Sequence, residues 1–304
     1  MIGSETLPVR PGRFRLFSHS QRNNTMGDLQ LTVQPTRSRR VFGQASDLYA
    51  RVFGYTSSDH TLNPKLLSAI VGNGGAAVAA TTPDDDLVGF AYGFVGFDAG
   101  ASFLYSQAAF IDPAYQGKGI GRLLKHEQAI VAATAGLASM RWAFDPTLAR
   151  NAHFNLDVLG ARGVRFAPNY YDENYSDRLI VEWSLAADVT PNRAAPRPAA
   201  PAPEFPPVDL AALAETPPAH WGRPAGRGDV IHVPIPSDNP ATSLHPALVA
   251  ELRDAVAETF AELFERGYVA ESCVRVDATT AAYTFVPAPA RAWHPAPCRD
   301  LAER

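Results

Sequence analysis

A glycine-rich segment at residues 116–122 could bind the phosphates of a nucleotide-like ligand. It has three glycines at alternate positions, and a glycine lets the backbone approach a phosphate because it carries no Cβ. The segment Ser102–Ile111 before it predicts a half-buried strand, and helical spacing of apolar residues begins at Ile120. Free N–H groups and the positive end of a helix dipole meet at such a junction, which therefore predicts an anion site.

The spacing of the glycines distinguishes between nucleotide-binding motifs. Counted from Gly117, a G-x-G-x-x-G fingerprint fails at Arg122, and the chain contains no G-x-x-x-x-G-K-[ST] run. Gln116, Gly119 and Gly121 instead match Q/R-x-x-G-x-G/A. This is the coenzyme A pyrophosphate signature of the GNAT N-acyltransferase superfamily, which the region resembles. Taken alone, the motif could also be a surface turn with incidental glycines.

Composition narrows the class of protein. The 304 residues are 46% hydrophobic and 10% aromatic, as in a folded globular chain of one large domain or two small ones. A net charge of -4 gives no reason to expect nucleic acid or a membrane surface as partner. Cys273 and Cys298 cannot by themselves form a disulfide framework or a zinc site, and Asp84–Asp86 reads as a solvated turn rather than a metal site. We find no signal peptide and no apolar run of roughly 18 residues, so we expect a cytoplasmic protein.

The periodicity of the chain predicts the order β-α-α-β-β-β-α-β-α-β-β, from the strand Leu29–Val33 to the strand Arg178–Ser184. The glycine turn follows the fourth strand and opens the helix Gly119–Gly136. This is the element order of the GNAT fold, and the resemblance places coenzyme A after that strand. We therefore expect an α/β (α+β) fold in which a mixed, mostly antiparallel sheet is flanked by helices.

Five segments are expected along the chain. Residues 1–26 read as a disordered extension, in which Met1 or Met26 could be the physiological start, and residues 27–186 as the acyl-CoA-binding domain. A Pro/Ala-rich linker, 187–229, carries a short predicted helix at Val208–Glu215. A small β-α-β-β extension at 230–287 is expected to pack on the first domain, and 288–304 to form a loose tail.

A longer pattern narrows the resemblance. W-x-F-D-P from Trp142 and RNA-x-F-N from Arg150 resemble one GNAT branch of predicted acetyltransferases, some of whose relatives are amino-acid N-succinyltransferases. The resemblance runs from Leu29 to Val286. The chain departs from the branch at Gln107, where histidine is usual, and also at Asp172 and Leu252. We therefore expect an acceptor pocket of its own.

The resemblance implies acyl-CoA, either acetyl-CoA or succinyl-CoA, as co-substrate. Some of the residues assigned to acyl-CoA have a structural alternative. Lys118 and Arg122 could equally be solvated surface charges, the side chains of the strand residues 109–111 could belong to the core, and Asn151 could be a helix N-cap. The residues assigned to acyl-CoA are Ala109, Phe110, Ile111, Gln116, Gly117, Lys118, Gly119, Ile120, Gly121, Arg122 and Asn151.

Acid-base residues are less clearly indicated. Many GNAT enzymes carry a proton-donating tyrosine where this chain has Leu156, so we name Tyr171 and the neighbouring Asn155 as candidates. Asp145 is the best-placed base, unless it only caps the turn before Pro146.

Two residues are candidates for contact with the acceptor, Gln107 and Arg178. Arg178 could bind a carboxylate, or it could pair with Asp145, Asp177 or Glu182. His153 is expected on the surface.

The sequence thus predicts an acyl-CoA-dependent N-acyltransferase that moves an acetyl or succinyl group to the amine of a small metabolite, an amino acid or a derivative. Two alternatives stay open: a CoA-binding protein with other acyl chemistry (O-acyl transfer, hydrolysis or decarboxylation), and a non-catalytic CoA sensor. We expect no metal, no nucleic acid and no membrane partner, and a homodimer stays open.

Overall fold

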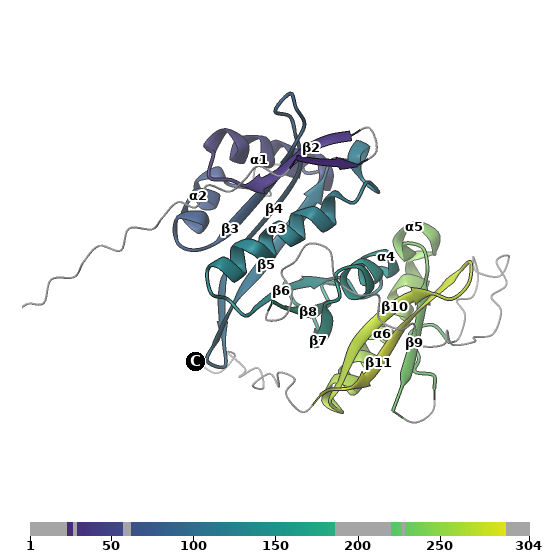
Figure 1. Ribbon diagram of the computed structural model, residues 1–304. Helices are drawn as coiled ribbons and strands as arrows, with labels where there is room; N and C mark the ends of the chain where they lie inside the picture. Colours follow the sequence, from purple (N-terminus) through teal and green to yellow (C-terminus); the bar gives the residue numbers. More distant parts are fainter. Residues whose placement is uncertain (1–22, 27–28, 57–61, 186–219, 227–228, 290–304) are drawn as a thin grey trace, which may run out of the picture.

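A computed structural model describes residues 23–26, 29–56, 62–185, 220–226 and 229–289. Its strands form one mixed sheet that runs from the N-terminal to the C-terminal part of the chain (Figure 1). The strand order in this sheet is β1-β2-β3-β4-β5-β6-β8-β7-β10-β11-β9. Among the described residues no helix is long and apolar enough to cross a membrane.

The predicted order of elements from the first strand to Ser184 is confirmed. The helix after the glycine turn begins at Ile120, with Gly119 as its N-cap. The elements are β2 (Leu29–Pro35), α1 (Arg39–Phe53), α2 (Pro64–Gly72), β3 (Ala76–Thr81), β4 (Leu87–Asp98), β5 (Ala101–Ile111), a 3-10 turn (Pro113–Tyr115), α3 (Ile120–Thr134), β6 (Ser139–Phe144), α4 (Ala149–His153) with a π turn (Phe154–Val158), β7 (Arg162–Ala167) and β8 (Arg178–Ser184).

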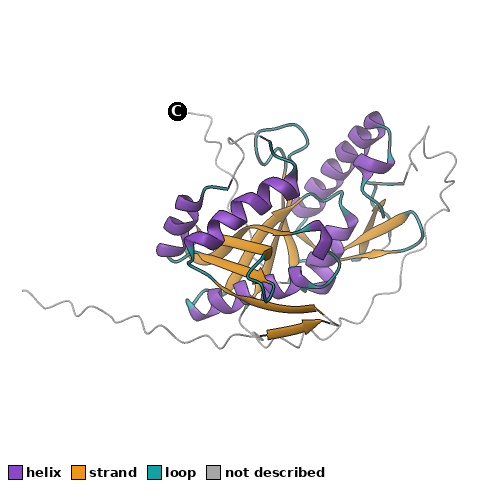
Figure 2. Ribbon diagram, turned by 90° about the horizontal axis from the view of Figure 1, so that it is seen from above, coloured by secondary structure: helices purple, strands orange, loops and turns teal. Residues whose placement is uncertain are grey.

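Helices cover both faces of the sheet (Figure 2). Successive strand residues point to opposite faces. On β3, Ala77 and Ala79 pack with α1 and α2, whereas Val78 and Ala80 pack with α3. Because both faces are covered, β3 is an almost continuous run of small apolar residues rather than an alternating one.

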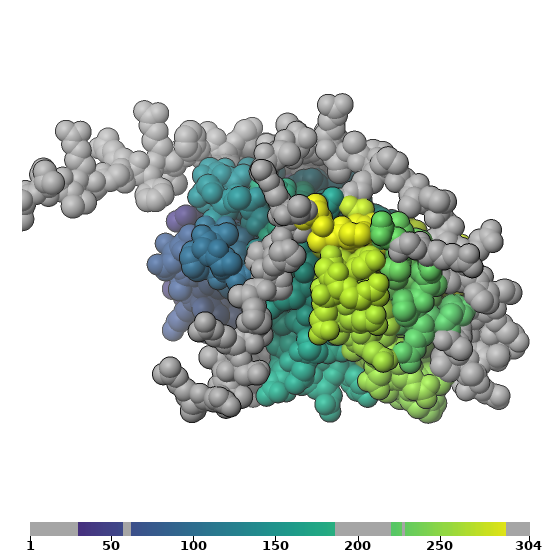
Figure 3. All heavy atoms as spheres, turned by 90° about the horizontal axis from the view of Figure 1, so that it is seen from below, coloured from purple at the N-terminus to yellow at the C-terminus, as the bar shows by residue number. Residues whose placement is uncertain are grey.

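The C-terminal extension continues the same sheet. It consists of β9 (Ile231–Pro236), α5 (Pro240–Ser243), α6 (Pro246–Glu265), β10 (Tyr268–Arg275) and β11 (Thr280–Pro287). β10 pairs with β7 at Ala270 and Gly163, where a Cβ on the glycine would lie 2.8 Å from the Ala270 Cβ. In the space-filling view the green and yellow residues of the extension lie directly against the teal residues of the middle of the chain (Figure 3).

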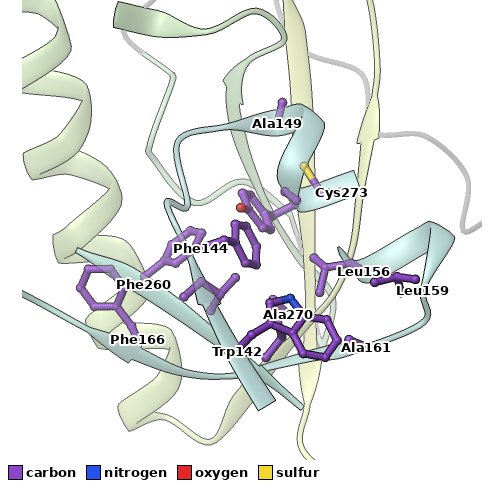
Figure 4. Close-up of a cluster of buried hydrophobic side chains, with 14 of the residues drawn as sticks. Trp142, Phe144, Ala149, Leu156, Leu159, Ala161, Phe166, Phe260, Ala270 and Cys273 are labelled. Atoms are coloured by element: carbon purple, nitrogen blue, oxygen red, sulfur yellow. The ribbon is translucent and has the colours of Figure 1, made fainter. Parts of the chain in front are cut away.

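An aromatic cluster joins the extension to the first part of the chain. Phe144 of β6, Phe166 of β7 and Phe260 of α6 gather in one buried core (Figure 4). The Phe260 ring lies edge-on to Phe166, with centroids 5.9 Å apart, and to Tyr283 of β11, at 5.1 Å. Such offset contacts of aromatic rings add to the free energy gained from burying their area.

Two features differ from the sequence expectation. A strand, β1 (Asn23–Met26), pairs with β2 inside the segment expected to be disordered. Backbone pairing at a sheet edge needs no apolar pattern, so the sequence carried no signal for it. At the end of the expected linker, Trp221 is buried and donates to the Thr280 hydroxyl. The predicted helix Val208–Glu215 and the tail 290–304 lie outside the described residues.

Asp157, in the π turn after α4, holds β10 by its carboxylate. It accepts hydrogen bonds from the Ser272 hydroxyl at 2.5 Å and from the Cys273 backbone N–H at 2.9 Å. His153 Nδ1 lies 3.2 Å from the same carboxylate and 3.0 Å from the Cys273 carbonyl oxygen. His153, expected on the surface, is therefore a half-exposed residue of this contact.

We predict that Asp157→Ala lowers the free energy of unfolding by about 2 kcal/mol, because two donors on β10 lose their acceptor. Urea unfolding followed by circular dichroism measures this change. Asp238→Ala is the matched control, since Asp238 is exposed and its carboxylate lies 3.4 Å from the exposed Arg275. Equal stability of the two variants would contradict the role given to Asp157.

Candidate functional site

The glycine turn places an open helix N-terminus beside the end of β5. Gly117 and Gly119 both have left-handed backbones, with φ of 75° and 74°, which side chains disfavour. Within the described part of the chain no side chain caps α3. The first N–H groups of a helix have no acceptor inside it, so this end can bind an anion through its backbone.

The third glycine of the motif has a different role. A Cβ on Gly121 would lie 3.3 Å from Ile111 Cδ1 and 3.5 Å from the Phe154 ring. Gly121 therefore allows α3 to pack closely between the end of β5 and the turn after α4. Gln116 donates to the Ile111 carbonyl at 3.3 Å, and Lys118 lies over the Tyr115 ring at 4.9 Å.

β5 and β6 diverge next to this turn. They form the parallel pair of the sheet, and their pairing is restricted to Leu104 with Met140 and Tyr105 with Arg141. β5 runs on to Ile111, held along its other edge by β4, and β6 runs on to Phe144. Backbone groups of residues 109–111 that face β6 have no strand partner there. An extended ligand with amide groups could hydrogen-bond to such an open edge.

Gln107 is an extra residue in β5. Gly93 of β4 pairs with Ser106 and Tyr92 with Ala108, which leaves Gln107 as a β-bulge. A Cβ on Gly93 would lie 2.4 Å from the Tyr105 carbonyl oxygen, so the bulge requires glycine there. After the bulge, Ala108 and Phe110 pack with α1 and α2.

The bulge opens into a cavity of about 420 Å³. Gln107 and Tyr171, both singled out from the sequence, line it, whereas Asp145, Asn155 and Arg178 do not. The hydroxyl groups of Tyr105 and Tyr170 meet in it at 2.9 Å. The lining residues are Phe94, Gly96, Phe97, Asp98, Phe103, Tyr105, Gln107, Arg141, Arg165, Tyr170, Tyr171 and Ile180.

Burial sets the proton affinity of the tyrosines around this cavity. It raises the pKa of Tyr105 far above its ordinary value, and the hydrogen bond to Tyr170 adds to this effect. Burial also raises the pKa of the nearby Tyr92 to about 12. Both phenols are therefore protonated at neutral pH and can donate hydrogen bonds, but they cannot act as bases there.

Asp145 has structural partners. Its carboxylate accepts from the Thr147 N–H at 2.9 Å and from the Thr147 hydroxyl at 2.7 Å, which caps the turn after β6. Arg253 of α6 binds its other oxygen at 2.7 Å. Asp145 therefore forms the turn cap that the sequence allowed. The role of Asp145 as a base stays a prediction.

The other predicted residues also lie outside the cavity lining. Asn155 is buried and accepts from the Trp142 indole at 2.9 Å. Asn151 is exposed inside α4, whose N-cap is Leu148, so it is not the N-cap that the sequence allowed. Arg178 donates to the Asp177 carbonyl at 2.8 Å and lies over the Tyr171 ring at 5.0 Å.

A buried lysine lies where β5 and β6 separate. Lys125 of α3 donates to the Ser106 hydroxyl at 2.7 Å, and its ammonium nitrogen is 4.0 Å from the Trp142 ring centroid. Ser106 and Trp142 each follow the last paired residue of their strand. Burial lowers the pKa of Lys125 to about 7. The sequence contained no signal for this residue beyond its helical position.

The described residues contain no group of three or more His, Cys, Asp or Glu side chains that could hold a metal ion. No protein-family model matches the sequence, and no curated protein matches it.

Solved structures show partial similarity to the chain. One is yncA from Salmonella typhimurium, solved with its cofactor acetyl-CoA, at a TM-score of 0.44 and 17% identity, covering 53% of this chain and 98% of that one. Another is an Escherichia coli N-acetyltransferase for an alanine of a ribosomal protein, at 0.42 and 18%, covering 51% and 94%. An aminoglycoside 6'-acetyltransferase of type Ii matches at 0.41 and 18%, covering 50% and 96%. At these low TM-scores and sequence identities, the matched structures assign no function to this chain.

We predict that the free energy of unfolding rises with pH between about 7 and 10, with a contribution from Lys125 of up to about 1.4 kcal/mol per pH unit. In this window the unfolded lysine carries a proton that the folded one has lost, because its folded pKa lies near 7 and its ordinary value is 10.5. Urea unfolding of Lys125→Met at several pH values should show that this slope is gone. Lys65→Met, at an exposed position of α2, should keep it. The same slope in both variants would mean that Lys125 is charged in the folded protein.

Proposed function

We propose that this chain is an acyl-CoA-dependent N-acyltransferase that transfers an acetyl or succinyl group to the amine of a small acceptor, an amino acid or a derivative. The observation that carries the proposal is the divergence of β5 and β6 beside an uncapped helix N-terminus with two left-handed glycines. An open strand edge suits the amide-bearing arm of coenzyme A, and the helix N-terminus suits its pyrophosphate.

The residues fit such a ligand in two ways. Gly117 has no atom within 4 Å of where its Cβ would be, so the turn is open on the side that a phosphate would approach. Ala109, which follows the divergence, is exposed on β5 although strand residues on either side of it are covered. We assign the pyrophosphate to residues 116–122 and the pantetheine arm to residues 109–111.

The reaction requires an amine and a thioester to meet between this edge and the cavity. The amine nitrogen attacks the thioester carbonyl carbon, a C–N bond forms and the C–S bond breaks. The nitrogen gives up one proton, and the departing sulfur takes one to become the thiol. Tyr105 is a protonated donor at the cavity and is hydrogen-bonded to Tyr170, and Lys125, whose pKa burial lowers to about 7, lies next to the divergence. A base with a pKa near 7 is suited to accept a proton from an α-amino group, whose ordinary pKa is close to 8.

A second function is favoured by the contacts of Asp145 and Asn155. Both residues form structural contacts, and Leu156 is buried in the core, which argues against an acid-base set at these three positions. This favours a CoA-binding protein with other acyl chemistry, or a sensor without turnover. Isothermal titration with acetyl-CoA and succinyl-CoA, followed by thiol release and product mass spectrometry with a panel of amines, distinguishes the three. Absence of acyl-CoA binding below about 1 mM would rule out all three functions.

We predict that Gly117→Ala weakens acetyl-CoA binding at least about tenfold, because the added methyl group stands where the phosphate approaches. Gly136→Ala is the matched control. Gly136, at the other end of α3, has φ of 80° and equally open surroundings. Both substitutions should cost about 1 kcal/mol of stability through the left-handed backbone, so only binding separates them. Equal Kd values for the two variants would remove the pyrophosphate from this turn.

A further inference from the structure

One arginine of the cavity has a buried nitrogen without an acceptor. Arg165 lies on β7, where it pairs across the sheet with Ile180, and both line the cavity beside Gln107. Its Nε is buried and finds no hydrogen-bond acceptor among the described residues. A buried donor left without a partner costs about 1–3 kcal/mol, and such groups are rare in folded proteins unless a ligand or water satisfies them.

The other two arginines near the cavity, Arg141 and Arg178, donate hydrogen bonds to protein acceptors. Arg141 binds Glu182 at 2.6 Å and Asp98 at 3.0 Å, and it lies over the Phe103 ring at 4.2 Å. Arg178 donates to a backbone carbonyl and lies over Tyr171. Arg165 differs from both, because its buried Nε has no hydrogen-bond acceptor within residues 62–185 or the described extension.

The surroundings of Arg165 suit a small organic anion. Arg165 lines the same cavity as Tyr105 and Tyr170, whose hydroxyl groups are hydrogen-bonded to each other, so one cation and two hydroxyl groups border the same space. The rim is aromatic, formed by Phe94, Phe97 and Tyr171, which are partly or largely exposed. A planar guanidinium binds a carboxylate through paired N–H donors, and the aromatic rim can cover an apolar side chain.

We propose that Arg165 binds the carboxylate of the acyl acceptor, so that the cavity selects amino acids with a free carboxyl group and an apolar or aromatic side chain. This inference rests on the proposed function, since it names the acceptor of that reaction. It assigns the acceptor carboxylate to Arg165, which the sequence did not single out, instead of Arg178, the candidate from the sequence.

The test compares acids with their amides. N-acetyl-L-phenylalanine and N-acetyl-L-leucine, as products of the reaction, are titrated into the full chain beside their carboxamides. The wild-type protein should bind each acid at least about tenfold more tightly than its amide, and Arg165→Gln should remove this preference. Arg165→Lys, which keeps the charge without the planar pair of donors, should keep a smaller preference. Arg266→Gln is the matched control, because it removes the same charge from an exposed helix end.

Stability gives a second readout. Because the Arg165 Nε has no acceptor among the described residues, Arg165→Gln should not lower the melting temperature, whereas loss of a structural ion pair would lower it. A lowered melting temperature, an unchanged preference for the acid in Arg165→Gln, or no binding of either acid at about 10 mM would each overturn the inference.

Acetyl-CoA titration of the same proteins keeps the two proposals apart. If acetyl-CoA binds to all variants and the acid preference does not depend on Arg165, the transferase stands and the carboxylate site is wrong. If acetyl-CoA binds to none and the preference depends on Arg165, the carboxylate site stands and the transferase is wrong.

Discussion

The parallel pairing of β5 with β6 ends after Tyr105 and Arg141, and the rest of the site depends on this interruption. β5 stays extended beyond that point because β4 holds its other edge as far as Ile111. α3 covers one face of the opening and places Lys125 between the two strands. The glycine turn at the start of α3 then faces the open edge. An unpaired strand edge inside a sheet is unfavourable unless something satisfies it, which is why the interruption points to a ligand.

The C-terminal extension forms the support on the far side of the opening. Arg253 of α6 binds Asp145 at the end of β6, and Asp157 after α4 binds β10. Tyr283 of β11 donates to the Pro146 carbonyl at 2.8 Å. β6 and the turn after it are therefore fixed from the side opposite to β5. The two strands can remain apart because each has its own partners: β4 for β5, and β8 with the extension for β6.

Much of the fold could be predicted because its signals are local. Apolar spacing marked the helices, Gly119 marked the start of α3, and alternation marked most strands. Contacts between side chains could not be predicted in this way. Asp145, Asn155 and Arg178 were named from their motif, and the sequence did not show their contacts with Arg253, Trp142 and Tyr171. Arg165 reads in the sequence as an ordinary strand residue. Only the tertiary arrangement shows that its Nε is buried and has no acceptor in the part of the chain that the structure describes.

The bulge at Gln107 has an evolutionary consequence. The bulge adds one residue, Gln107, to β5. The residues after it, Ala108 and Phe110, pack with α1 and α2. Deleting that single codon would leave a regular strand in which Ala108 and Phe110 still face α1 and α2. One insertion or deletion could therefore add or remove a cavity residue without disturbing the packed core, and acceptor preference could diverge among relatives of this chain while their fold stays the same.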